Sequence, residues 1–205
     1  MNARTNLIHL TEISLPNLEK YLLNYTKMTK VINLVGAPGV GKTLMSCLVF
    51  SKLKMMHLTA EYVQEFAKTL VWQQRYEELY NQYYTTYEQY KMIKAIDGAV
   101  DYIVCDSGLI LGLFYNIYNE QNVSNVEKTQ AMILGKMKEF DNIYIFLERN
   151  ETLPFEKAGR LQTEEECKKI NDNIKQLLID NDLQFKSFLS SERSVDGIIE
   201  YILSF

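Results

Sequence analysis

The chain has 205 residues, with 26 acidic and 22 basic side chains and a formal net charge of −4. This length predicts one domain with a substantial core, and the charge argues against tight, sequence-independent binding to nucleic acid. The cysteines Cys47, Cys105 and Cys167 have neither disulfide-framework nor zinc-site spacing, no apolar run approaches a membrane span, and the N-terminus lacks a signal-peptide core. We therefore expect a cytoplasmic protein with reduced thiols and no membrane association, suited to small-molecule chemistry.

Two parts are expected along the chain. Residues 1–30 are predicted to be a leader or an early helix of unclear role, and residues 31–205 a single domain. In chain order, we expect strand 31–35, helix 42–54, strand 55–59, helices 61–70 and 71–96, strand 102–106, helices 109–118 and 126–140, strand 142–147, helix 163–181, strand 184–189 and helix 195–203. This alternation predicts an α/β fold with a five-stranded parallel sheet, helices on both faces, and ligands at the carboxyl ends of the strands.

The most specific motif is a complete Walker A signature between the first strand and the first helix. It consists of Gly36, Ala37, Pro38, Gly39, Val40, Gly41, Lys42 and Thr43, and Leu44 continues into the helix. The glycines let successive amide N–H groups face an anion, and the helix N-terminus adds partial positive charge. Lys42 should reach the β- and γ-phosphates of ATP, and Thr43 should help to coordinate Mg²⁺. The motif predicts a P-loop NTPase fold that binds ATP and magnesium.

Carboxylates follow two further predicted strands. Asp106 ends the apolar run 102–106, as in a Walker B strand, and is predicted to be a metal ligand or catalytic acid; the alternative is a helix N-cap. Glu61 lies just beyond the run 55–59 and is interpreted as a general base or a ligand of metal-bound water, with a first-turn helix acid as the alternative. Glu65, one helical turn later, is expected to be solvated or to assist.

A basic segment, residues 149–163, joins the fourth strand to a helix whose start is marked by Thr163 and Glu166, a capping box. Arg149 and Arg160 are candidate catalytic residues, because guanidinium groups that close over the γ-phosphoryl group would stabilise the transition state. The segment therefore predicts a short lid of the kinase type. An ordinary exposed loop with solvated cations is the alternative.

Other side chains between the second and third predicted strands could form an acceptor pocket. Trp72 could stack on an aromatic base, Gln89 could pair with it, and Arg75 could bind a phosphate or hydroxyl. Tyrosines recur at helical spacing from Tyr76 to Tyr90 and are interpreted as a helical core stripe rather than a base-stacking platform. The polar loop 119–124 is expected to be able to move.

These motifs together resemble the P-loop nucleoside kinases. The resemblance is carried by the Walker loop, the run Glu61 to Phe66, the pair Gln89 and Tyr90, and the strand end Cys105-Asp106-Ser107, and spans about residues 31–190. It is nearest to the ribosylnicotinamide-kinase domain of the bifunctional NAD-synthesis regulator and to related AAA-type ATPases and kinases often carried by phages. Deoxynucleoside kinases are a more distant likeness.

The resemblance implies that Glu61 lies near the acceptor hydroxyl and that Asp106 is the acid of the third strand. The family often has two acids there, whereas Ser107 and Gly108 follow Asp106 in this chain, so the division of labour between Glu61 and Asp106 stays open.

The expected activity is transfer of a phosphoryl group from Mg-ATP to a small hydroxyl- or phosphate-bearing acceptor, above all a nucleoside or nucleotide. One alternative is a kinase of a hydroxymethylated base within DNA, and another is a nucleotide-dependent switch or ATPase that binds a protein partner. An acceptor-dependent rate of ATP consumption would distinguish a kinase from a switch.

Overall fold

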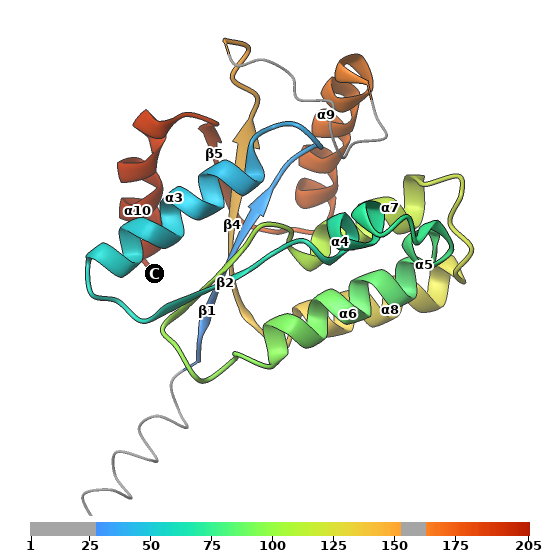
Figure 1. Cartoon of the computed structure of the whole chain (residues 1–205), viewed down its shortest axis with the longest axis horizontal. Coiled ribbons are helices and arrows are strands. Elements are labelled where there is room, and N and C mark those ends of the chain that lie inside the picture. The colour runs from blue at the N-terminus through green and yellow to red at the C-terminus, as the bar shows by residue number, and fades with distance from the viewer. Residues whose placement is uncertain (1–27, 153–162) are drawn as a thin grey trace, which may run out of the picture.

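The computed structural model describes residues 28–152 and 163–205 (Figure 1). Its elements, in chain order, are β1 Lys30–Val35, α3 Lys42–Met55, β2 Ala60–Val63, α4 Phe66–Trp72, α5 Tyr76–Tyr80, α6 Gln82–Lys94, β3 Tyr102–Cys105, α7 Leu109–Tyr118, α8 Val126–Met137, β4 Asp141–Glu148, α9 Glu164–Asp180, β5 Phe185–Leu189, the short 3₁₀ helix η1 Glu192–Ser194, and α10 Val195–Leu203. In this part of the chain, no helix combines the length and apolar character needed to cross a membrane.

The strands form one parallel sheet in the order β2-β3-β1-β4-β5, which confirms the predicted five-stranded α/β fold. β1 lies at the centre, and its side chains alternate between the two faces of the sheet. Val31 and Val35 contribute to one hydrophobic core, and Ile32 and Leu34 to the other. A strand that is buried on both faces needs a continuous apolar sequence, and residues 31–35 supply it with Asn33 as the exception.

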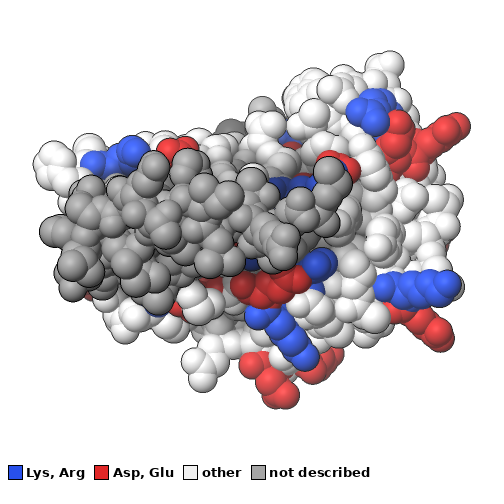
Figure 2. Space-filling model, turned by 90° about the horizontal axis from the view of Figure 1, so that it is seen from below, with Lys and Arg blue, Asp and Glu red and all other residues white. Residues whose placement is uncertain are grey.

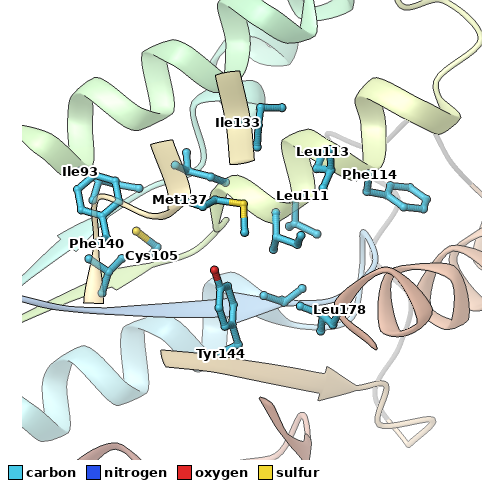
Figure 3. Packing of buried hydrophobic residues seen from close by; sticks show 14 of the residues in the cluster. Ile93, Cys105, Leu111, Leu113, Phe114, Ile133, Met137, Phe140, Tyr144 and Leu178 are labelled. Atoms are coloured by element: carbon cyan, nitrogen blue, oxygen red, sulfur yellow. The ribbon is translucent and has the colours of Figure 1, made fainter. Parts of the chain in front are cut away.

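Helices cover both faces of the sheet. α3 and α10 lie on one face, and α6 to α9 lie on the other (Figure 1). Figure 3 shows part of the larger core, in which Phe140 and Met137 meet Cys105 and Tyr144 of the sheet, with Leu178 of α9 alongside. The sheet therefore holds the ends of β1, β2 and β3 next to one another, where the candidate site lies.

The prediction of a second strand at residues 55–59 is wrong, and the helix predicted at 61–70 begins only at Phe66, as α4. α3 continues to Met55, the chain turns at His57 with a φ of 62°, and β2 runs through Ala60–Val63. A short apolar run fits the end of a helix as well as a strand, and pairing with β3 decides the matter, since Ala60 lies opposite Tyr102. Glu61 therefore lies inside the strand.

The helix predicted for residues 71–96 is interrupted, and its range holds the end of α4, then α5 and α6. The chain breaks at Gln74, whose φ is 56°, and again at Asn81, whose side chain accepts a hydrogen bond from the Tyr84 N–H and begins α6. Three rings of α6, those of Tyr83, Tyr87 and Tyr90, stack from solvent toward the core. These contacts favour the interpretation of the tyrosines as a helical stripe.

Hydrogen bonds hold the start of α9 and the loop that follows α7. The capping box is confirmed: the Thr163 N–H donates to Glu166 at 2.7 Å and the Glu166 N–H donates to the Thr163 hydroxyl at 3.3 Å. In the loop predicted to be able to move, the Val123 N–H donates to the Tyr80 carbonyl at 3.0 Å. This bond ties the loop to α5.

Candidate functional site

The Walker loop turns at three glycines with positive φ angles, namely 155° at Gly36, 82° at Gly39 and 102° at Gly41. Gly41 lies in the left-handed region at the N-cap of α3, and a side chain at this position would collide with the buried Ser190. Only glycine combines these backbone angles with so close an approach. The loop thus has the backbone path of an anion-binding nest at a helix N-terminus.

Lys42 carries the positive charge of this loop. Its ammonium group donates to the carbonyl of Gly36 at 3.0 Å and to that of Ala37 at 3.1 Å, and the residue is buried. Both partners are neutral carbonyl oxygens of the same loop. An anionic phosphate would be a stronger acceptor for this ammonium group, because charge-assisted hydrogen bonds are about twice as strong as neutral ones.

Two side chains from distant parts of the chain, those of Asn171 and Arg149, hold the Walker loop in place. Arg149 was predicted to lie at the site, and Asn171 was not. Asn171 of α9 accepts a hydrogen bond from the Ala37 N–H at 2.8 Å. Arg149 donates to the Gly39 carbonyl at 3.2 Å and pairs with Glu164 at 2.8 Å. Polar residues are ordinary on an amphipathic helix, so no sequence signal distinguished Asn171 from its neighbours.

The structure thus brings Arg149, one of the predicted catalytic residues, to the Walker loop. Its observed contact is with the loop backbone. Arg160 and most of the predicted lid lie outside the described residues, and the transition-state role of both arginines stays a prediction.

Asp106 meets Thr43 at the end of β3. The Thr43 hydroxyl donates to Asp106 Oδ2 at 2.7 Å, and the Tyr62 hydroxyl donates to the same oxygen at 3.2 Å. Asp106 Oδ1 is buried, and no described residue forms a hydrogen bond with it. The N-cap alternative for Asp106 is wrong, since Gly108 is the N-cap of α7 and no side chain caps that helix.

A divalent metal fits this pair of residues. A buried carboxylate oxygen without a partner costs free energy unless something else satisfies it. Mg²⁺ is typically held by one or two protein oxygens together with water and substrate phosphates, so the Thr43 hydroxyl and the Asp106 carboxylate suffice as protein ligands. The described part of the chain has no cluster of three or more His, Cys, Asp or Glu side chains that could hold a metal ion.

A cavity of about 980 Å³ extends from the Walker loop between α4, α5 and α7. Lys42, Thr43 and Glu65 line its floor. Its walls are rich in aromatic rings, contributed by Trp72, Tyr80, Phe114, Tyr115 and Tyr118. This volume lies at the upper end of the range for small-molecule sites, so it can accommodate a nucleotide together with a second small molecule.

Glu65, rather than Glu61, is the acid that follows β2 and faces the cavity. Glu65 is half-buried between β2 and α4, whereas Glu61 lies mid-strand with an exposed side chain and is not among the cavity-lining residues. Burial raises the pKa of the Glu65 carboxyl; the positive charge of Lys42 opposes this effect, and the negative charge of Asp106 adds to it. Glu65 therefore takes the place that was predicted for Glu61, as the acid that follows the second strand. The structure gives no support to a catalytic role for Glu61.

Gln89 holds the segment that carries Glu65. Its side-chain oxygen accepts from the Phe66 N–H at 2.8 Å, and its amide nitrogen donates to the Gln64 carbonyl at 3.2 Å. The donor and acceptor predicted to pair with a base are thus engaged by the backbone on either side of Glu65. Gln89 also borders a cavity of about 30 Å³ that shares Glu65 with the large one.

The other two predicted acceptor residues have different positions. Trp72 lines the large cavity and its ring is exposed, and its role in stacking stays a prediction. Arg75 is exposed, pairs with Glu78 at 2.9 Å and is not among the cavity-lining residues. An arginine that is close in sequence to a pocket residue need not face the pocket, and here the break after α4 turns it away.

The parallel sheet, the Walker loop at its carboxyl edge and the Thr43–Asp106 pair define a P-loop nucleotide-binding protein with the fold of P-loop kinases. A family model described as an AAA domain matches residues 31–190, and the chain belongs to this family. A search of curated protein sequences finds no match.

Two solved structures are similar to this chain, and the first of them has the same fold. A deoxyadenosine kinase from M. mycoides, determined with its products dCMP and dCDP, superposes with a TM-score of 0.59 at 20% identity, over 86% of this chain and 100% of that chain. The APS kinase of Mycobacterium tuberculosis has a TM-score of 0.48 at 8% identity, over 86% of this chain and 98% of that chain.

Proposed function

We propose that the protein is an ATP-dependent, magnesium-assisted phosphotransferase whose acceptor is a nucleoside or a closely related small hydroxyl compound. The observation that carries this proposal is that Lys42, Thr43 and Glu65 line one cavity. Groups suited to bind phosphate and a carboxylate of raised pKa thereby face the same cavity. The deoxyadenosine kinase with the same fold makes an acceptor of this class plausible as the starting point for a screen.

The residues divide into a donor set and an acceptor set. The loop amides and Lys42 would hold the β- and γ-phosphates of ATP. Thr43 and Asp106 would hold a magnesium ion, which supplies neutralisation of the charge on the phosphate oxygens when it is bound. The acceptor oxygen would attack the γ-phosphorus as the bond to the β-γ bridging oxygen breaks, ADP would leave, and Glu65 would take the hydroxyl proton.

Glu65 favours a hydroxyl acceptor over a phosphate acceptor. A hydroxyl group must lose a proton during transfer, whereas a phosphate monoester, with a second pKa of about 6, is already largely ionised at neutral pH. A half-buried carboxylate with Asp106 nearby would repel such an anion. The aromatic walls add a stacking surface for a base, with Trp72 at the exposed end.

The net charge of −4 favours a small acceptor over DNA, because it offers little attraction for a polyanion. Figure 2 shows the face at the amino ends of the strands, away from the cavity, where basic and acidic side chains lie next to one another among the coloured residues.

The test is a transfer assay with γ-labelled ATP and magnesium against nucleosides, nucleoside monophosphates and duplex DNA that contains a hydroxymethylated base. We expect label on at least one nucleoside and loss of that label in Glu65→Gln. Label on monophosphates or on DNA alone would contradict the nucleoside assignment. ATP hydrolysis without transfer to any acceptor would favour a nucleotide-dependent switch.

A further inference from the structure

A second hydroxyl group, besides that of Thr43, reaches the Asp106 carboxylate. Thr43 and Tyr62 both donate to Asp106 Oδ2, at 2.7 Å and 3.2 Å respectively. Asp106 Oδ1 is the buried oxygen that no described residue bonds. The two hydroxyl groups thus occupy one oxygen of the carboxylate and leave the other available.

Tyr62 is itself held in position by its surroundings. It pairs with Val104 in the β2–β3 ladder, next to the strand end that carries Asp106. Its ring centroid lies 6.2 Å from that of Phe50 in α3. The strand pairing and the ring contact thus hold the Tyr62 hydroxyl against the Asp106 carboxylate, to which it donates.

We propose that Tyr62 is a positioning residue that orients the Asp106 carboxylate, so that Oδ1 is available to a divalent metal ion or its bound water. This inference rests on the proposed function, because it assigns Tyr62 to the same Mg-ATP site. With Thr43 as its single donor, the carboxylate could pivot about one hydrogen bond. The second donor, from a different element, removes that freedom.

The Thr43 hydroxyl is expected to bind both the metal ion and Asp106, so the hydrogen bond from Tyr62 matters more for the orientation of the carboxylate. Its oxygen is the predicted metal ligand, and its hydrogen is donated to Asp106. Tyr62 has no such second task and can hold Oδ2 whatever the position of the Thr43 side chain. Residues that orient a metal ligand typically contribute about 10- to 100-fold to metal affinity.

Tyr62→Phe tests the proposal, because it removes the hydroxyl and keeps the ring against Phe50. Mn²⁺ binding to the protein saturated with a nonhydrolysable ATP analogue can be measured by electron paramagnetic resonance. We expect the Kd for Mn²⁺ to rise about 10-fold, with the affinity for the analogue in the absence of metal unchanged. Tyr144→Phe is the matched control, since Tyr144 is a buried tyrosine in the core on the opposite face of the sheet.

A double-mutant cycle separates positioning from packing. If Tyr62 acts through the carboxylate, Tyr62→Phe should have little further effect on Mn²⁺ binding in an Asp106→Asn background. Unchanged Mn²⁺ affinity in Tyr62→Phe, an equal loss in Tyr144→Phe, or full additivity with Asp106→Asn would each overturn the inference.

This experiment needs no acceptor, so its outcome is separate from that of the transfer assay. A protein that phosphorylates no acceptor, but loses Mn²⁺ affinity on Tyr62→Phe, would refute the proposed function and support the role of Tyr62. A protein that transfers phosphate, but whose Mn²⁺ affinity does not depend on Tyr62, would do the reverse.

Discussion

The donor end and the acceptor end of the cavity are built in different ways. The donor end is a contiguous loop, Gly36 to Thr43, whose binding groups are mainly backbone amides, and Asn171 and Arg149 fasten that backbone from outside. The proposed acceptor end collects side chains from the β2–α4 connection, α4, α5 and α7, each placed by the packing of its own segment. In the proposed function, phosphate binding would depend on one backbone path, whereas the choice of acceptor would depend on how several elements pack together.

The two ends also differ in how their charged groups are satisfied. Lys42 has two carbonyl partners, and Asp106 accepts from two hydroxyl groups. Around Glu65, by contrast, Gln89 bonds the backbone on either side. Gln89 therefore fixes the backbone on either side of Glu65, and the Glu65 carboxylate would be available to the proposed acceptor. The predictions below test this contrast.

Lys42→Ala should have the largest effect. The ammonium group is expected to stabilise negative charge in the transition state and is not part of the hydrophobic core. Turnover should therefore fall by about 10³-fold or more, with the fold retained. Transfer rates and circular dichroism on the same sample check this. Near-normal turnover in a folded variant would refute the assignment of the loop as a phosphoryl-transfer site.

Glu65→Gln should lower kcat by about 10²- to 10⁴-fold, the usual contribution of a general base. The raised pKa of Glu65 also predicts that the parent rate increases with pH through a value above the ordinary 4.5, and that the variant lacks this limb. Glu61→Gln is the matched control, since it makes the same change on the exposed part of β2. Equal losses in both variants would contradict the assignment of the base to Glu65.

Trp72→Ala should have a moderate effect confined to the acceptor. Loss of stacking worth about 0.5–1.5 kcal/mol corresponds to a rise of roughly 2- to 13-fold in the acceptor KM, with the KM for ATP unchanged. Steady-state kinetics with each substrate varied in turn provide the measurement. Arg75→Ala, which alters an exposed residue of the same region outside the cavity, should leave both constants near those of the parent.

The smallest effect concerns stability. Because the folded-state pKa of Glu65 is raised, its contribution to stability is present below its unfolded value, about 4.5, and is lost as pH rises through the folded pKa. Glu65→Gln should therefore be more stable than the parent near pH 8, by about 1 kcal/mol, with the difference vanishing near pH 4. Urea denaturation at the two pH values measures this, and a variant less stable at pH 8 would show that the carboxylate is favourably bound in the fold.

The sequence by itself determined the donor end. The apolar run 31–35, the glycine pattern and the start of α3 at Lys42 are local signals, and each reports a requirement of the backbone that does not depend on distant residues. The same holds for the strand that delivers Asp106 and for the capping box at Thr163. The predicted lid with Arg160 lies outside the described residues and stays a prediction.

Only the tertiary structure decided the acceptor end. The position of β2 depends on its pairing with β3, and the strand lies later in the chain than predicted. The acid that lines the cavity is therefore Glu65 and not Glu61. The side chains of Gln89 and Asn171 accept hydrogen bonds from backbone N–H groups that are distant in the sequence. Local pattern cannot encode such choices, because an edge strand and a polar residue on a helix acquire their roles from the elements packed against them.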